Sequence, residues 1–146
     1  MHVRPIKGVS FDQWLVLWRG YLGEAFFDME PSIHPSVFAR LQDDSNPLMG
    51  VVVGHDVPVG FAHFYLHPST YSTADACTLE DLYVDPGWRR QGLANLLISS
   101  VEHRSKELGA YVLHWKTGRQ NAAAIALYDG IADQAGFVTY RLPLSK

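Results

Sequence analysis

Apolar residues recur every three or four positions after Ser10, a spacing typical of a helix with one buried face. This apolar face would comprise Phe11, Trp14, Leu15, Trp18, Leu22 and Phe26. Ser10 and Gln13 match a capping box, which predicts that the helix begins at Phe11. Pro31 interrupts the pattern. A second short helix is predicted from Pro35, with inward-facing residues Val37, Phe38 and Leu41.

The β-rich runs are short and are separated by turn residues. Residues 2–9 suit an edge strand, because Pro5 is tolerated only at an edge. The next two runs enclose a Gly- and Pro-containing turn, which predicts an antiparallel hairpin. The later runs predict a third central strand, a short strand and a last strand. In order, the runs after the first are 48–53, 59–66, 77–84, 111–115 and 137–142.

Two further helices complete the predicted elements. One has an apolar face of Leu93, Leu96, Leu97, Val101 and Leu108. Because it connects two strands, residues 79–84 and 111–115 are expected to run parallel. The other is rich in alanine, follows Asn121 and runs through Ala135, with Gly136 closing it.

Composition indicates a globular protein. The 146 residues, 47% of them hydrophobic and 18% charged, suit one domain spanning 1–146. A net charge of -3 argues against nucleic acid or an anionic membrane as the main partner. Cys77 is the only cysteine, the N-terminus lacks a signal-peptide core, and no apolar run approaches the roughly 20 residues of a membrane span. We therefore expect a cytoplasmic protein. The seven histidines lack metal-ligand spacing, so no metal is expected.

The stretch from Leu79 to Ala94 carries the first functional signal. It is typical of a strand, a turn with two arginines and a glycine, and a helix start. A helix start favours anions, Gly92 lets a ligand approach the backbone, and Arg89 and Arg90 add positive charge. These features predict a ligand that carries phosphate. The chain lacks both the Gly-Lys-Ser/Thr of a P-loop and the three glycines of the dinucleotide fingerprint.

The sequence resembles the GNAT superfamily of N-acetyltransferases. Arg89 to Ala94 matches its Gln/Arg-x-x-Gly-x-Gly/Ala signature, and Asn121, Tyr128 and Gly136-Phe137 resemble its later "Asn … Leu-Tyr … Gly-Phe" element. The resemblance covers residues 2–142. Within the superfamily, Leu79-Glu80-Asp81-Leu82 is similar to the spermidine/spermine and thialysine acetyltransferases. The long segment 129–137 resembles the polyamine/histone acetyltransferase branch.

The resemblance implies an α/β (α+β) fold with a mixed, mostly antiparallel sheet, helices on both faces and a splayed parallel strand pair. It also implies acetyl-CoA as cosubstrate. The main chain of Leu82, Tyr83 and Val84 would pair with the pantetheine arm, and Asn121 would bond the pantetheine region. The pyrophosphate would lie on the backbone amides of Gln91, Gly92, Leu93 and Ala94, beside Arg89 and Arg90. In this chain Arg90-Gln91 replaces the usual Gly-Lys or Gly-Gln pair.

The reaction implied is attack of an amine on a thioester, so the protonated amine must first lose a proton. Glu80 is the first candidate for the base or for holding a water, by its match to the family's glutamate. Asp81 is the second, although strict alternation would point it to the opposite face. Alternatively, one of the two carboxylates only caps the backbone or pairs with an arginine. Tyr128 would donate a proton to the leaving thiolate, or else it is a core tyrosine.

The acceptor side is the least informative part of the sequence. Asp28 and Glu30, between the first two helices, and His63, beside the proposed site, are candidates to bind a cationic amine along with Glu80 and Asp81. We expect acetyl transfer to a small polyamine-like or amino-acid-like primary amine. The alternatives are a protein lysine or N-terminal acetyltransferase and a non-catalytic acyl-CoA-binding domain. A homodimer is expected from the resemblance, with the last strand as a surface for it.

Overall fold

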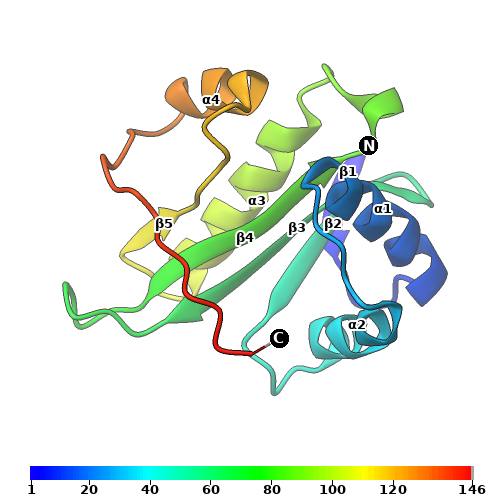
Figure 1. Cartoon of the computed structure of the whole chain (residues 1–146), viewed down its shortest axis with the longest axis horizontal. Coiled ribbons are helices and arrows are strands. Elements are labelled where there is room, and N and C mark those ends of the chain that lie inside the picture. The colour runs from blue at the N-terminus through cyan, green and yellow to red at the C-terminus, as the bar shows by residue number, and fades with distance from the viewer. Residues whose placement is uncertain (146) are drawn as a thin grey trace. The chain divides into compact units, whose positions relative to one another are not determined.

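The structure, a computed structural model, describes residues 1–145 and contains two compact units (Figure 1). The second unit starts at Lys116 and holds one helix, α4 (Ala122–Asp129). The first unit spans Met1–Trp115. In chain order it contains β1 (His2–Pro5), α1 (Phe11–Glu24), η1 (Pro31–Ile33), α2 (His34–Gln42), β2 (Met49–Gly54), β3 (Pro58–His67), β4 (Ala76–Val84), η2 (Pro86–Trp88), α3 (Leu93–Glu107) and β5 (Val112–His114).

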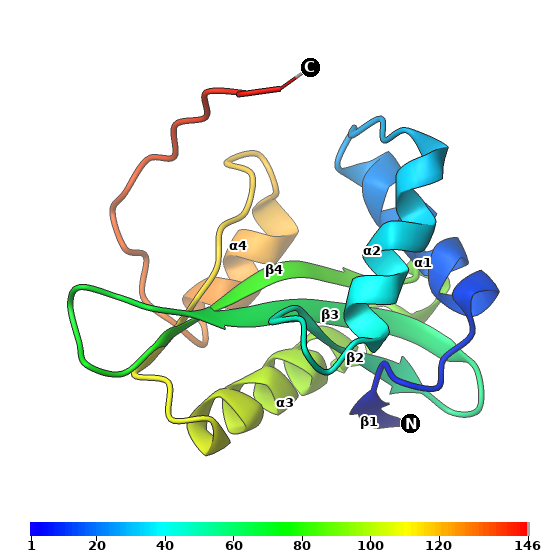
Figure 2. The same ribbon diagram turned by 90° about the horizontal axis from the view of Figure 1, so that it is seen from below.

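The five strands form one sheet in the order β1-β2-β3-β4-β5. The pairs β1–β2, β2–β3 and β3–β4 are antiparallel, and β4–β5 is parallel. Helices α1 and α2 lie on one face of the sheet and α3 on the other (Figure 2). The predicted mixed, mostly antiparallel sheet with helices on both faces is confirmed. The single domain expected over 1–146 stays a prediction.

The predicted start of α1 is confirmed: the Ser10 hydroxyl accepts the backbone N–H of Gln13 at 3.2 Å. Its apolar face packs on the sheet in an aromatic core, in which Trp14 stacks on Trp18 with ring centroids 5.4 Å apart. The buried members of this core are Ile6, Val9, Trp14, Leu17, Trp18, Leu22, Leu41, Val52, Phe61 and Tyr83. On the other face, Leu93, Leu97, Ile98 and Val101 of α3 are buried, whereas Leu96 and Leu108 are each 40% exposed.

The spacing predicted that Phe26 would continue the apolar face of α1, and this prediction is wrong. The helix ends at Glu24, and Phe26 has a φ of 52° and a side chain that is 97% exposed. The helix therefore ends two residues before the last position of the predicted apolar face. Phe27, 51% exposed, lies beside it. The left-handed backbone of a bulky residue costs of order 1–3 kcal/mol, so this connection between α1 and η1 is strained.

Two predictions for the C-terminal part are wrong. Helix α4 ends at Asp129, not Ala135, because the N–H groups of Gly130 and Ile131 close its last turn onto Leu127 and Tyr128. Glycine is a poor helix former, so Gly130 ends the helix although the apolar spacing continues. Residues 137–142 form no strand, since no strand pairs with them in the described chain. Three of their side chains are 83–91% exposed: Phe137, Tyr140 and Leu142.

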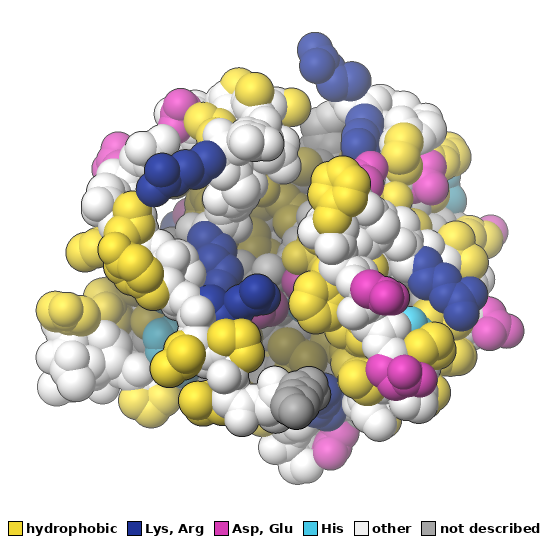
Figure 3. Space-filling view, in the orientation of Figure 1, with side chains coloured by type: hydrophobic (Ala, Val, Ile, Leu, Met, Phe, Trp, Pro, Cys, Tyr) yellow, Lys and Arg dark blue, Asp and Glu magenta, His cyan; other side chains and the backbone are white. Residues whose placement is uncertain are grey.

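On the face drawn in Figure 3, Lys and Arg occur in several separate places among Asp and Glu. None of the helices in residues 1–145 combines the length and apolar character that crossing a membrane requires.

Gly20 of helix α1 lies close to Tyr83 of β4, and this contact gives a stability prediction. A Cβ at Gly20 would overlap the Tyr83 hydroxyl and lie 2.8 Å from its Cζ. Gly20→Ala is therefore expected to destabilise the protein by about 1–3 kcal/mol through overpacking. Gly23→Ala is the matched control, because nothing lies within 4 Å of its added Cβ. In a denaturant titration we expect Gly23→Ala to stabilise by about 0.5–1 kcal/mol. Equal effects of the two substitutions would contradict the close contact.

Candidate functional site

Strand β4 has a long edge without a strand partner. It pairs with β3 along its length, but with β5 only over Ala76–Thr78. From Leu79 to Val84 the edge that faces away from β3 carries no partner strand among the residues described. The predicted splay of the parallel pair is confirmed by this register. Such an edge offers backbone donors and acceptors to an extended ligand.

The directions of the backbone N–H and C=O groups decide which residues of β4 can hydrogen-bond a ligand at this edge. The Tyr83 carbonyl lies against Gly60 on β3, since a Cβ added at Gly60 would be 2.8 Å from it. In an antiparallel ladder alternate residues direct both backbone groups to the same side. Leu82 and Val84 therefore face the free edge, and the Val84 carbonyl already accepts the Arg89 Nε–H at 2.8 Å. The groups left for a ligand are those of Leu82 and the Val84 N–H.

A β-bulge lies where the edge begins. Asp81 pairs with His63 and Leu79 with Phe64, so Glu80 is an extra residue without a partner on β3. Side chains therefore do not alternate strictly between the two faces of the sheet across residues 79–81. The prediction that Asp81 points to the face opposite Glu80 depended on strict alternation and no longer follows. The bulge shows in the packing as well. Cys77 contacts Ser105 on α3, whereas Tyr83, six residues on, packs against α1.

The turn between β4 and α3 has the shape of an anion cradle. Gly92 is the N-cap of α3 with a φ of 78°, and Arg90 has a φ of 64°. A Cβ at Gly92 would meet nothing within 4 Å, so the space in front of it is open. The first hydrogen bond of α3 runs from Leu96 N–H to the Gly92 carbonyl, which leaves the preceding N–H groups unpaired within the helix. These N–H groups and the helix dipole suit a phosphate.

The two arginines of this turn differ in their contacts with the rest of the protein. Arg89 donates to both carboxylate oxygens of Glu24 at 2.7 and 2.8 Å, and its guanidinium lies 5.5 Å from the Tyr83 ring centroid. Arg89 therefore ties the cradle to the end of α1. Arg90 is exposed and has no hydrogen bond or ion pair with any residue in 1–145. It occupies the position where the resembled family has glycine, and its left-handed φ explains that preference.

A buried chain of hydrogen bonds ends on Asp81. Trp14 Nε1–H donates to His63 Nε2 at 3.2 Å, and His63 Nδ1 lies 2.9 Å from Asp81 Oδ2. Because an indole N–H can only donate, His63 Nε2 must hold a lone pair and Nδ1 must carry the hydrogen. The contact from His63 to Asp81 is therefore a hydrogen bond from a neutral imidazole and not an ion pair. His63 is 1% exposed and the Asp81 side chain 14%, so the carboxylate is held in one orientation with a small accessible area.

The remaining predicted residues are not all gathered here. Glu80 is exposed, and so are Asp28 and Glu30 in the connection between α1 and α2. Asn121 and Tyr128 belong to the second unit. Asn121 caps α4, its side-chain oxygen accepting the Ala124 N–H at 3.2 Å. Burial raises the pKa of the Tyr128 phenol above its usual value, so it remains protonated at neutral pH.

Sequence patterns did not indicate the partners of two predicted residues, His63 and Arg89, or the bulge at Glu80. Trp14 was assigned to the core, and its indole donor to His63 has no local signal. Glu24 lies 65 positions from Arg89, so their contact has none either. The bulge at Glu80 is hidden because one inserted residue leaves the run of strand-forming residues intact. In residues 1–145 no three His, Cys, Asp or Glu side chains are grouped as a metal ion would require.

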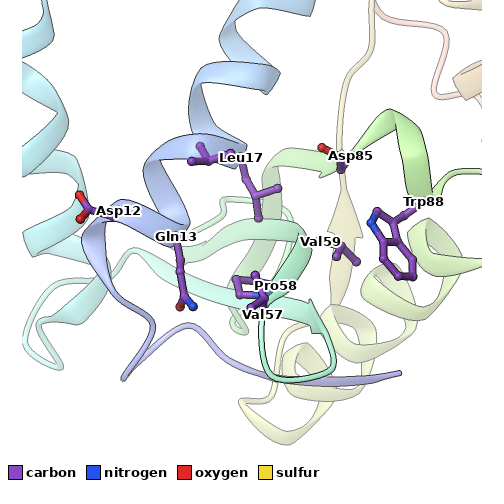
Figure 4. A pocket seen from close by; sticks show the side chains of 9 residues that line it. Asp12, Gln13, Leu17, Val57, Pro58, Val59, Asp85 and Trp88 are labelled. Carbon is purple, nitrogen blue, oxygen red and sulfur yellow. The ribbon is translucent and has the colours of Figure 1, made fainter.

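An open groove of about 450 Å³ lies elsewhere on the first unit (Figure 4). It is lined by Asp12, Gln13, Val16 and Leu17 of α1, by residues 57–59 and by Asp85 and Trp88. None of the residues predicted to bind cofactor or acceptor lines it.

Comparison with known proteins connects this geometry to a chemistry. The profile of the Acetyltransferase (GNAT) family matches residues 12–130. The D-amino-acid N-acetyltransferase HPA3 of Saccharomyces cerevisiae is 30% identical over 142 residues, covering 95% of this chain and 88% of that protein. The thialysine N-epsilon-acetyltransferase of Caenorhabditis elegans is 33% identical over 90 residues, covering 58% of this chain and 56% of that protein.

Solved structures share the fold at low identity. The crystal structure of a probable acetyltransferase has a TM-score of 0.85 at 21% identity and covers 100% of this chain and 99% of that one. The structure of AAC(6')-Iy with the bisubstrate analogue CoA-S-monomethyl-acetylneamine has a TM-score of 0.82 at 18% identity. It covers 98% of this chain and 97% of that one.

Proposed function

Since the chain belongs to the acetyltransferase (GNAT) family, we propose that it transfers an acetyl group from acetyl-CoA to the primary amine of a small, cationic, amino-acid-like molecule. The observation that carries the proposal is the free edge of β4, which leads directly into the cradle at the start of α3. An extended pantetheine arm and a pyrophosphate need these two features in this order. When bound, acetyl-CoA supplies an activated thioester carbonyl.

The cosubstrate is held mainly by backbone groups. Leu82 and the Val84 N–H pair with the pantetheine arm, and Tyr83 contributes through its ring, which supports Arg89. The pyrophosphate lies against the amides of Gln91, Gly92, Leu93 and Ala94. The donor set fits a doubly charged anion, because it combines unpaired N–H groups, a helix start and the free guanidinium of Arg90.

Arg90 gives a binding prediction. Arg90→Gln keeps a side chain on the strained backbone and removes only the charge. Because exposed charge pairs contribute up to about 1 kcal/mol, we expect the Kd for acetyl-CoA to rise about fivefold. Arg19→Gln, an exposed change of the same charge on α1, is the control and should leave the Kd unchanged. Calorimetry at low and moderate salt measures both. An unchanged Kd in Arg90→Gln would show that Arg90 does not contribute to binding acetyl-CoA.

The acceptor is held as a cation and attacks as a free amine. We assign Asp81, fixed by His63, to the acceptor ammonium, because its second oxygen has no described protein partner. Glu80, exposed at the bulge, takes the proton or holds the water through which it leaves. By the family resemblance alone, the phenol of Tyr128 would donate a proton to the departing sulfur and Asn121 would bond the pantetheine region. Asp28 and Glu30 would add to the negative potential on the acceptor side.

Amino-acid-like acceptors are favoured by the relatives' names. Two relatives are an acetyltransferase for D-amino acids and one for thialysine, and a third, from Streptomyces coelicolor, is an L-2,4-diaminobutyric acid acetyltransferase. A second candidate function is acetylation of a protein N-terminus. It is favoured by a 36% identity over 62 residues, 42% of this chain, to the [ribosomal protein bS18]-alanine N-acetyltransferase of Escherichia coli.

A thiol-release assay tests the function. The chain is incubated with acetyl-CoA and one of thialysine, a D-amino acid, 2,4-diaminobutyric acid, a polyamine, or peptides with a free lysine or N-terminal alanine. We expect release above the acetyl-CoA-only rate with at least one small amine. Release with a peptide alone would favour the second candidate function. Binding of acetyl-CoA with no release for any acceptor would favour a non-catalytic acyl-CoA-binding domain.

The homodimer and the cytoplasmic location stay predictions. The surface expected for the dimer was a strand at residues 137–142, which the structure does not contain. The proposal of a homodimer therefore depends on the family resemblance alone. Light scattering of the purified chain would test it.

A further inference from the structure

Three polar side chains lie across the sheet at the point where β4 and β5 part. Thr78 and His114 are the last residues paired between these strands. Thr78 Oγ1 lies 3.0 Å from His67 Nε2 on β3 and 3.2 Å from His114 Nε2 on β5. The two imidazole rings are 5.6 Å apart and perpendicular. No part of the proposed function above uses these residues.

The hydrogens of this cluster can be placed from the partners. His67 Nδ1 is 3.0 Å from the Pro68 carbonyl, which only accepts, so Nδ1 carries a hydrogen. In the neutral ring His67 Nε2 then accepts from the Thr78 hydroxyl. The single hydroxyl hydrogen is thereby used, so the bond to His114 must come from His114 Nε2–H. The lone pair of His114 is left on Nδ1, which has no partner among residues 1–145.

We propose that His114, Thr78 and His67 form a proton wire that removes the proton lost by the acceptor amine, which rests on the proposed acetyl transfer. Through the water held by Glu80, the ammonium passes one proton to His114 Nδ1 and becomes a neutral amine. His114 Nε2 passes its hydrogen to Thr78 Oγ1, and the hydroxyl passes its own to His67 Nε2. One proton enters, one positive charge ends on His67, and both hydrogen bonds to Thr78 reverse direction.

The position and the surroundings suit this role. His114 is exposed at the end of β5, next to the start of the free β4 edge, and Glu80 follows Thr78 by two residues on β4. The far end of the wire is the His67 Nδ1–H beside the exposed Pro68, from which solvent can take the proton. Partial burial and the neighbouring His67 lower the pKa of His114, so its ring is neutral at pH 7 and can accept.

Two tyrosines lie beside the residues of the wire. Tyr65 on β3 has its ring 5.7 Å from that of His67. Tyr111, which precedes β5, bonds the Ser69 hydroxyl at 2.9 Å. In this arrangement Asp81 binds the ammonium, Glu80 holds the water through which the proton leaves, and the wire carries the proton away.

The experiment uses the full chain and a matched pair of variants. Thr78→Val removes the hydroxyl with little change in shape, and Thr78→Ser keeps it. The first readout is ¹⁵N NMR of the histidine rings, which does not depend on turnover. We expect His67 with its hydrogen on Nδ1 and His114 with its hydrogen on Nε2, and titrations that are coupled in Thr78→Ser but independent in Thr78→Val. The same tautomer on both rings, or identical titrations in the two variants, would overturn the wire.

The second readout is the pH dependence of kcat/KM with thialysine and acetyl-CoA. We expect Thr78→Val and His114→Gln to lower kcat/KM about 100-fold at neutral pH, the low end of general-base contributions, and Thr78→Ser to restore it. The loss should shrink at high pH, where the amine is already neutral. Equal kcat/KM for Thr78→Val and wild type would overturn the proposal. If wild type releases no thiol with any acceptor, the acetyl transfer itself fails, and the NMR result alone decides whether the wire exists.

Discussion

Replacing Tyr128 with phenylalanine is expected to lower kcat about 100-fold while leaving the Kd for acetyl-CoA unchanged. The leaving thiolate needs a proton, and a positioned acid contributes roughly 10²–10⁴-fold. Phenylalanine keeps the ring and removes only the hydroxyl, so packing of α4 is retained. Kcat from thiol release and Kd from calorimetry separate chemistry from binding.

The pH profile provides the control for Tyr128. Burial raises its phenol pKa, so the hydroxyl stays protonated to a higher pH than an ordinary tyrosine, whose pKa is about 10. Wild-type kcat should therefore fall only on the alkaline side of that value, and the fall should be absent in Tyr128→Phe. Tyr140→Phe, a change at a 91% exposed tyrosine of the same unit, should behave as wild type. Normal turnover in Tyr128→Phe would reject the general-acid role.

Replacing Asp81 with asparagine is expected to raise the KM for a cationic acceptor about 10–100-fold. The asparagine oxygen can still accept the His63 Nδ1–H, so the buried chain from Trp14 is kept and only the charge is lost. A hydrogen bond to a charged group contributes about 1.5–3 kcal/mol, which corresponds to this change in KM. Steady-state kinetics with thialysine measures it.

Two further variants make the Asp81 result specific. Asp12→Asn removes an exposed charge that lies outside the hydrogen-bonded chain, and KM should not change. His63→Asn should raise KM less than Asp81→Asn, because the carboxylate remains but is no longer held in one orientation. An unchanged KM in Asp81→Asn, with the Kd for acetyl-CoA also unchanged, would show that the acceptor cation binds elsewhere.

Local patterns predicted most elements of the first unit because their signals are local. Ser10 and Gln13 place the start of α1 by a single hydrogen bond between neighbours. The strand, turn and glycine before α3 predicted the cradle, since the φ of 78° at Gly92 is a property of that residue. The parallel pairing of β4 with β5 follows from the helix that connects them.

The features that the sequence did not indicate have one physical cause, which is that the deciding contact lies far along the chain or is absent. Residues 137–142 alternate like a strand, but a strand requires a partner, and pattern alone does not provide one. Asp81 is oriented by His63 on β3 and, through it, by Trp14 on α1. Arg89, whose role at the phosphate stays a prediction, is bonded to Glu24 across 65 positions. The spacing of apolar and polar residues in the sequence does not indicate such contacts.

The most direct test of the account follows the acetyl group itself. The purified chain is incubated with acetyl-CoA and thialysine, and the released thiol and the acceptor are both measured, the acceptor by mass spectrometry. We predict one acetylated thialysine for each thiol released. Thiol release without an acetylated amine, or acetyl-CoA binding without release for any amine tested, would contradict amine acetylation as the function of this chain.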